Sequence, residues 1–237
     1  MSLAVLALGT TLSANAAVSI VGVSNATQST YSGDASALDL INQGQSTFSS
    51  VAYSEEPRFG GATRGNAANN GAHGADGANT EITFWLSAVA NETYTITYDL
   101  NTAVNAAGYD INSIQSIHAW TNNSGNQKNH NYTVEVSTVS GGAAFSNIAT
   151  VAYLPFSDAG QSGASKVNIT EDDTGILATG VDQIRFTYTI PDPSGVQASP
   201  TIREIDVFGV ATIPEPSSTA LFGLGALGLA LRRRRSK

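Results

Sequence analysis

The dominant pattern along residues 18–212 is an alternation of apolar and polar side chains with a period of two. It is clearest in three segments, 93–98, 132–137 and 184–190. Such alternation is typical of β-strands that have one buried face and one exposed face. No stretch keeps the 3.6-residue period of an amphipathic helix for more than two or three turns. The pattern therefore predicts an all-β domain.

Segments rich in Gly, Asn and Ser separate the predicted strands, as expected for an antiparallel β-sandwich. The longest of them, residues 58–79, has 22 residues and no periodicity. A loop of this length is either functional or disordered. Because residues 18–212 contain no internal repeat and no second change of composition, the sequence predicts one domain over this range.

The first 17 residues have a different character. An apolar stretch, Leu3–Leu12, is followed by Ala-Asn-Ala at 14–16, the small-x-small pattern that signal peptidase recognises. This predicts a secretory signal peptide, residues 1–17, cleaved after Ala16 or Ala17. No Lys or Arg precedes the apolar stretch, which is unusual for such a signal. The alternative is a buried helix of the fold.

The last segment, residues 213–237, contains three features in a fixed order. The triplet Pro214-Glu215-Pro216 comes first, an uncharged apolar run over 220–231 follows, and Arg232, Arg233, Arg234 and Arg235 end it. The apolar run is shorter than the ~20 residues of a full membrane span, so bilayer thinning or snorkelling of the arginines is needed. The arginines then stay on the cytoplasmic side. We therefore expect a short transmembrane helix, with the rest of the chain outside the cytoplasm.

This order of features resembles the PEP-CTERM sorting signal of Gram-negative bacteria. The resemblance implies that an exosortase recognises the Pro-Glu-Pro triplet and removes the tail while the protein is transiently inserted in the inner membrane. It also implies delivery to the cell surface or to an extracellular matrix, in bacteria that make exopolysaccharide. An ordinary tail anchor would account for the apolar run and the arginines but not for the triplet.

Charge divides the chain at the same point. Residues 17–213 carry six Lys and Arg against eighteen Asp and Glu, a net charge of -12, whereas residues 214–237 have a net charge of +4. An acidic domain repels phosphate backbones, so nucleic-acid binding is not expected. The chain has no cysteine, which excludes disulfides, a thiol nucleophile and thiolate metal sites.

The order of strands in the body resembles the galactose-binding-like jelly roll of discoidin and coagulation-factor C-type domains. The resemblance rests on segments 108–120, 131–137 and 145–149, then, after a long insertion, on 181–186 and Glu-Ile-Asp-Val-Phe-Gly at 204–209. Upstream, residues 40–48 look like a degenerate form of a conserved segment of that family. The resemblance implies a jelly-roll β-sandwich. It also raises a structural calcium at Glu204, but Asn42 and Gln43 stand where the family often has Asp-Gly, so calcium is not supported.

Catalysis is not indicated by the polar residues. Glycosidases need two carboxylates facing each other in one cleft, but Glu55 and Glu56 precede a proline and read as loop residues. The acidic run 171–173 reads as a solvated turn, with calcium binding as the weaker alternative. The three histidines, His73, His118 and His130, match no zinc spacing and accompany no Gly-x-Ser-x-Gly motif. We expect them to be surface-loop residues.

Sugar binding is the better functional hypothesis, because neutral sugars are held by an aromatic face and a few directional polar groups. In the family that the chain resembles, ligands bind to loops at one end of the sandwich. The alternative for Trp120 is that it caps the core. Arg185 and Arg203 are expected to pair with acids such as Glu204 or Asp206. The candidate ligand-binding residues are Tyr53, Arg58, Phe59, Arg64 and Trp120.

The sequence therefore predicts an exported, non-catalytic surface or matrix protein that contacts polysaccharide. One alternative is a structural or adhesive protein that packs against copies of itself. A second is a glycan-active hydrolase.

Overall fold

The computed structural model describes residues 17–25, 39–41, 84–85, 93–120, 128–155, 163–189 and 201–213. Within these ranges the chain forms nine strands, and every pair of neighbours is antiparallel. They are β1 (Val18–Asn25), β2 (Phe84–Trp85), β3 (Thr93–Asp99), β4 (Tyr109–Trp120), β5 (His130–Thr138), β6 (Gly142–Tyr153), β7 (Gly163–Glu171), β8 (Ala178–Thr189) and β9 (Thr201–Ala211).

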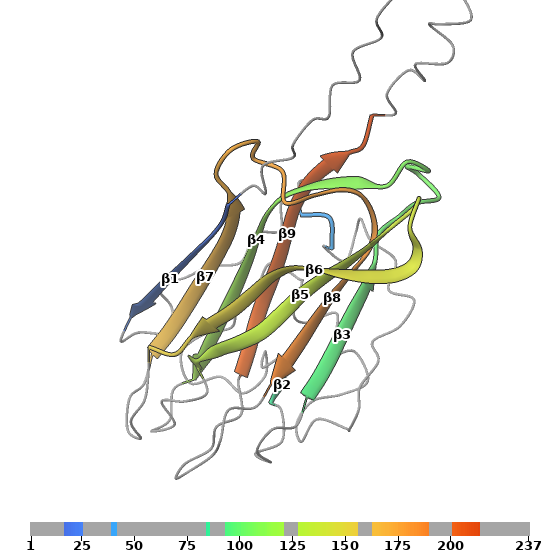
Figure 1. The fold of residues 1–237 in the computed structure, drawn as a ribbon. Coiled ribbons are helices and arrows are strands. Elements are labelled where there is room, and N and C mark those ends of the chain that lie inside the picture. The colour runs from blue at the N-terminus through green and yellow to red at the C-terminus, as the bar shows by residue number, and fades with distance from the viewer. Residues whose placement is uncertain are drawn as a thin grey trace, which may run out of the picture.

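The strands form two layers (Figure 1). One layer has the order β1-β7-β4-β9-β2, and the other has the order β6-β5-β8-β3. The layers are continuous at one corner, where Tyr109 of β4 pairs with Val181 of β8. The predicted all-β, antiparallel jelly-roll sandwich is confirmed.

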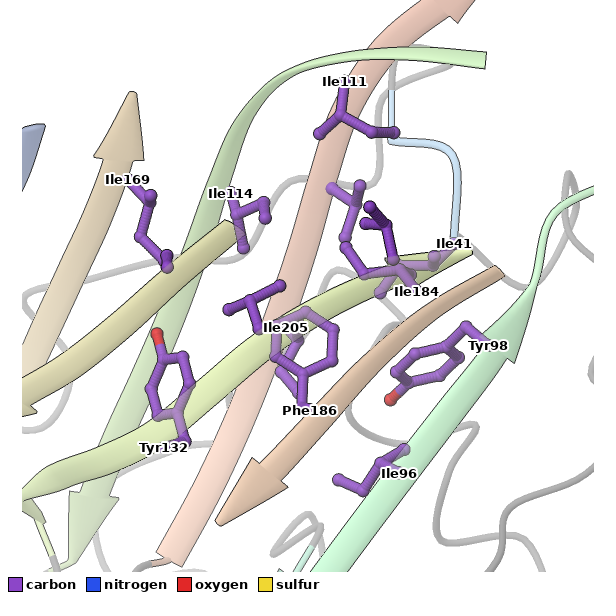
Figure 2. Packing of buried hydrophobic residues seen from close by; sticks show 14 of the residues in the cluster. Ile41, Ile96, Tyr98, Ile111, Ile114, Tyr132, Ile169, Ile184, Phe186 and Ile205 are labelled. Carbon is purple, nitrogen blue, oxygen red and sulfur yellow. The ribbon is translucent and has the colours of Figure 1, made fainter. Parts of the chain in front are cut away.

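The core lies between the layers because the two-residue alternation turns one face of each strand inward. In β5 and β8 the inward positions are in register, so that Tyr132 lies opposite Tyr188 and Val134 opposite Phe186. Figure 2 shows that these strands meet isoleucines from β4, β7 and β9. The buried aromatic rings pack edge-on or tilted, with centroids 4.9–6.2 Å apart, which adds to the energy of area burial.

Gly209, the last residue of the Glu-Ile-Asp-Val-Phe-Gly segment, pairs with Ile111 of β4. A Cβ atom at this position would lie 2.4 Å from the carbonyl oxygen of Asp110 and 2.7 Å from a methyl carbon of Leu40. No side chain fits without moving the backbone. The residue that helped to indicate the fold is therefore required by the packing of the two strands.

One strand was missed by the sequence analysis. β7 lies in the stretch interpreted as a long insertion, yet it is a central strand that pairs with β1 on one side and β4 on the other. It supplies Val167 and Ile169 to the core. Its alternation was overlooked because Ser165, Lys166 and Asn168 make the segment polar overall.

The two ends of the sandwich differ. At one end, here called the terminal end, Val18 pairs with Glu171 and Ala211 pairs with Tyr109. The first strand therefore begins at this end and the last strand finishes there. At the opposite, loop-bearing end, Trp120 pairs with Gly163, and the connections 121–127, 156–162 and 190–200 leave the strands. The 12 residues of β4 separate the two ends by roughly 35 Å.

No helix within the described ranges is long and apolar enough to cross a membrane. The predicted signal peptide and C-terminal helix lie outside these ranges.

Candidate functional site

The loop-bearing end is the candidate site, because Trp120, one of the predicted ligand residues, ends β4 there. Residues Tyr53, Arg58, Phe59 and Arg64 lie outside the described ranges, but their segment leads into β2, which pairs with Thr201 and Ile202 at this end. The structure thus places the backbone of Trp120 at the site, and the other four positions stay predictions.

The base of this end is built by His118 of β4 and His130 of β5, and the prediction that they are surface-loop residues is wrong. Both side chains are completely buried. Their rings stack with centroids 3.8 Å apart and an interplanar angle of 8°. The inward-facing positions of β4, which include Ile114 and Ser116, continue to His118. His118 therefore belongs to the strand and not to the loop in which it was expected.

His118 is fixed by a backbone group from the start of β5. Its Nδ1 lies 2.9 Å from the carbonyl oxygen of Asn129. A carbonyl only accepts hydrogen bonds, so Nδ1 donates and Nε2 carries the lone pair in the neutral ring. His118 therefore ties residue 129 to β4.

His130 takes part in a chain of hydroxyl groups that also has one consistent direction. Ser165 Oγ donates to the carbonyl oxygen of Lys128, so it accepts from His130 Nε2 at 2.9 Å. The Nδ1 atom of His130 then accepts from Ser116 Oγ at 2.9 Å, and Ser116 accepts from the hydroxyl of Tyr132 at 2.7 Å. The chain links β4, β5 and β7 and ends on the backbone of residue 128.

Burial holds both histidines neutral at physiological pH. It lowers the pKa of His118 to about 4, against the smaller opposing effect of the Asn129 carbonyl. The pKa of His130 is lowered well below its usual value by burial and by the neighbouring His118. Burial likewise raises the pKa of the Tyr132 and Tyr188 hydroxyls. The cluster is a neutral polar layer at the end of an apolar core.

Two polar atoms of this layer, His118 Nε2 and the Tyr188 hydroxyl, are buried and have no hydrogen-bond partner among the described residues. The two rings have centroids 5.8 Å apart. The hydrogen-bond chain ends on backbone carbonyls and presents no nucleophile at the surface. The arrangement therefore positions residues 128 and 129.

Glu204, where a calcium ion had been considered, is completely buried on β9, opposite Ile117 of β4. Within the described part of the chain, no group of three or more His, Asp or Glu side chains is arranged to hold a metal ion.

The acidic run that follows β7 is a turn closed by its own first residue. The carboxylate of Glu171 accepts from the amide nitrogens of Asp173 and Gly175 at 2.7 and 2.8 Å, and from the Thr174 hydroxyl at 2.6 Å. These bonds, chiefly that from Thr174, lower the pKa of Glu171 to about 2. Asp172 and Asp173 are exposed. The solvated-turn interpretation is confirmed for Asp172 and Asp173, whereas Glu171 is the buried last residue of β7.

The two strand arginines, Arg185 and Arg203, each bond to a neighbouring strand. Arg185 pairs with an acid, as expected, but the acid is Glu135 on the neighbouring strand at 3.0 Å, and its guanidinium lies 3.9 Å above the ring of Phe145. Arg203 donates from Nε to the carbonyl oxygen of Ala119 at 3.1 Å. It thereby supports the backbone directly before Trp120.

The C-terminal end has one decisive similarity. Residues 212–235 match the PEP-CTERM protein-sorting motif. The chain therefore carries this sorting motif, which indicates export, and the prediction from the Pro-Glu-Pro triplet, apolar run and arginine cluster is confirmed. The match covers Pro214, Glu215, Pro216 and Arg232–Arg235. No curated protein matches the sequence.

Several solved structures are similar to the body. CpGH89CBM32-5 from Clostridium perfringens, in complex with GalNAc-β-1,3-galactose, is 19% identical with a TM-score of 0.41, covering 67% of this chain and 94% of its own. The lectin-binding domain of Lectinolysin complexed with Lewis b is 14% identical with a TM-score of 0.42, and the match covers 72% of this chain and 95% of that domain. The C-terminal domain of a chitobiase from Bacteroides fragilis is 20% identical with a TM-score of 0.41, and the match covers 74% of this chain and 99% of that domain. Similarities this low assign no function to the chain.

Proposed function

We propose that this protein is exported, sorted by an exosortase to the cell surface or extracellular matrix of a Gram-negative bacterium, and binds extracellular polysaccharide there without catalysing a reaction. The observation that carries the proposal is the match of residues 212–235 to the PEP-CTERM protein-sorting motif. Signal peptidase removes residues 1–17, and the apolar run holds the protein in the inner membrane until the exosortase acts at the Pro-Glu-Pro triplet.

The position of the tail relative to the loops supports a binding role. The sorting motif follows β9 directly, and β9 ends at the terminal end of the sandwich, beside Tyr109. Trp120 and the connections that flank it are at the other end, roughly 35 Å away. A body held by its tail therefore keeps the loop-bearing end free to contact a ligand. The acidic charge of the body disfavours an anionic ligand and favours a neutral one.

Binding is tested with the purified protein on an array of neutral and acidic glycans and on the exopolysaccharide of the host. We expect neutral glycans to be retained. We expect Trp120→Ala to weaken binding at least tenfold, because a sugar–aromatic contact is lost, and Trp120→Phe to weaken it less. Val104→Ala is the matched control, since Val104 is 79% exposed near the terminal end. Absence of binding to every glycan would refute the binding role, and undiminished binding by Trp120→Ala would refute its site.

Sorting is tested separately in the host. Replacing Glu215 by Ala should leave the tail attached and the protein in the inner membrane, whereas wild type should appear at the surface or in the medium. Ser218→Ala, within the same matched segment but outside the Pro-Glu-Pro triplet, is the control. Equal processing of Glu215→Ala and wild type would contradict exosortase recognition of the triplet.

A second candidate, self-association as a structural surface protein, is favoured by β1. Within the described residues this edge strand pairs only with β7, it has no charged residue, and Val21 is 53% exposed. Charged residues are the usual protection of such edges. Two copies can therefore pair antiparallel through this edge. Light scattering should then show a dimer that Val21→Lys dissociates and Val104→Lys does not. A monomeric wild type would exclude this candidate.

A further inference from the structure

The stacked histidines make contacts that reach beyond the core. His118 bonds to the carbonyl oxygen of Asn129, and His130 reaches the carbonyl oxygen of Lys128 through Ser165. Residues 128 and 129 are the end of the connection that begins after Trp120. The pair therefore fixes the point where this connection returns to the sandwich. Arg203 holds the other side of the connection at Ala119.

We propose that the His118–His130 pair is a proton-sensitive contact that holds residues 128–131 in place at neutral pH and releases them in acid, while the rest of the sandwich stays folded. Resting on the proposed function, this makes polysaccharide binding at the loop-bearing end dependent on pH. The pair acts as a positioning element, because neither histidine is exposed to a ligand.

The geometry disfavours a positive charge on either histidine ring. The rings are parallel at 3.8 Å, so a charge on one lies directly against the other. Among the described residues, the aromatic ionisable side chains that face the rings are Tyr132 of β5, Tyr153 of β6 and Tyr188 of β8. Lys128, which is buried beside the cluster, carries a positive charge in acid and adds to the cost of a second one. Tyrosines are neutral in acid and cannot compensate a buried positive charge. Among the described residues no carboxylate bonds to either ring.

Protonation of His130 also disrupts its hydrogen bonds. Nδ1 of His130 accepts from Ser116, and after protonation it can only donate. Ser116 must then turn its hydroxyl away, although it already accepts from Tyr132. The conflict is relieved when His130 and the adjoining backbone leave the cluster.

Release is confined to one end because the polar cluster occupies only the last layer of the core. Below Tyr132 the inward positions of β5 and β8 are apolar, including Val134 and Phe186. These residues contain no group that titrates in acid. Opening of 128–131 therefore frees both histidines without opening the centre of the sandwich.

Hydrogen exchange of the purified protein between pH 7 and pH 4.5, corrected for the intrinsic pH dependence of exchange, tests the proposal without any ligand. A histidine in an open segment has a pKa near 6.5, whereas the same histidine in the closed structure stays neutral. Below pH 6.5, each such histidine therefore raises the equilibrium constant for opening by up to about tenfold per pH unit. We expect amides of 128–131 to lose protection by up to about a hundredfold per pH unit. Amides of β8, residues 181–189, exchange through global unfolding and should stay better protected than those of 128–131 at every pH.

The variant His118→Asn keeps an amide donor for the Asn129 carbonyl and removes one titrating group. Its protection at 128–131 should fall by at most about tenfold per pH unit. His73→Asn, which changes the remaining histidine of the chain, should behave as wild type. The imidazole signals of the wild-type protein, assigned by comparison with His73→Asn, should titrate well below pH 6.5, a measurement that stands even where a variant fails to fold.

Three results would overturn the proposal. They are imidazole midpoints of both buried histidines near pH 6.5, equal protection of 128–131 and 181–189 at every pH, and an unchanged pH dependence in His118→Asn. If polysaccharide binds at neutral pH, its affinity should fall in wild type as the pH is lowered to 4, where His118 becomes protonated. If no polysaccharide binds at any pH, the proposed function fails, and the exchange experiment still decides the role of the histidines.

Discussion

Replacing Tyr188 by Phe should stabilise the protein, although Tyr188 is among the largest buried side chains. Its hydroxyl is buried and has no hydrogen-bond partner among the described residues. Tyr132, its register neighbour on β5, is equally buried, but its hydroxyl donates to Ser116 at 2.7 Å. The two tyrosines are therefore a matched pair that differs in one hydrogen bond.

The magnitudes follow from the cost of desolvating a hydroxyl. A buried polar group without a partner costs about 1–3 kcal/mol, and a satisfied hydrogen bond contributes about 0.5–1.5 kcal/mol. Tyr188→Phe removes an uncompensated group and should raise the free energy of unfolding by about 1 kcal/mol. Tyr132→Phe removes a satisfied bond and leaves Ser116 with one partner fewer, so it should lower that free energy by about 1–2 kcal/mol.

Urea denaturation, followed by circular dichroism at pH 7, measures both changes. With a slope of about 2 kcal/mol per molar urea, the midpoint should rise by roughly 0.5 M for Tyr188→Phe and fall by roughly 0.5–1 M for Tyr132→Phe. If Tyr188→Phe destabilises the protein as much as Tyr132→Phe does, the hydroxyl of Tyr188 is satisfied and the description of the polar layer is wrong.

Three further predictions concern stability. Gly209→Ala should lower the free energy of unfolding by about 2–3 kcal/mol, because its Cβ would lie 2.4 Å from the carbonyl oxygen of Asp110; an unchanged urea midpoint would contradict this. The carboxyl of Glu171, with a pKa of about 2, stabilises the fold above its ordinary pKa of 4.5 and loses this effect as pH falls toward 2. Glu171→Gln should therefore lower the melting temperature at pH 7 and flatten its decline in acid, and a parallel decline would refute this role. The depressed pKa of His118, about 4 against an ordinary 6.5, makes stability fall as pH drops below 6.5, by about 2 kcal/mol between pH 7 and pH 5, with His130 adding in the same direction. A urea midpoint that stays constant over this range would show that the histidines are not buried.

The sequence predicts the strands that have one buried face and one solvent-exposed face. β3, β5 and β8 alternate strictly; β3 and β5 enclose the predicted segments 93–98 and 132–137, and β8 contains all of 184–190 except residue 190, which lies outside the described ranges. β7 is not evident from the sequence because its polar residues Lys166 and Asn168 make the apolar–polar alternation hard to see. The strand is recognised only once its pairing with β1 and β4 is known. Strand pairing is a property of the assembled sheet, and the composition of one strand does not reveal it.

The candidate site was less predictable. Trp120 was identified by its place after a strand, and the structure puts it at the loop-bearing end. The burial of His118 and His130 was not foreseen, because histidines that flank a polar loop are usually exposed. The signal was present in the period of β4, since His118 continues the inward positions of Ile114 and Ser116. Stacking with His130 depends on the approach of two strands in different layers, which no local pattern encodes.

The central claim, that the tail is a sorting signal rather than part of the working protein, is tested most directly by the intact mass of the protein recovered from the surface or medium of its host. The account predicts a mass that lacks residues 1–17 and the arginine cluster at 232–235. A mass that retains the arginines would mean that the tail is a permanent anchor, and would contradict processing by an exosortase.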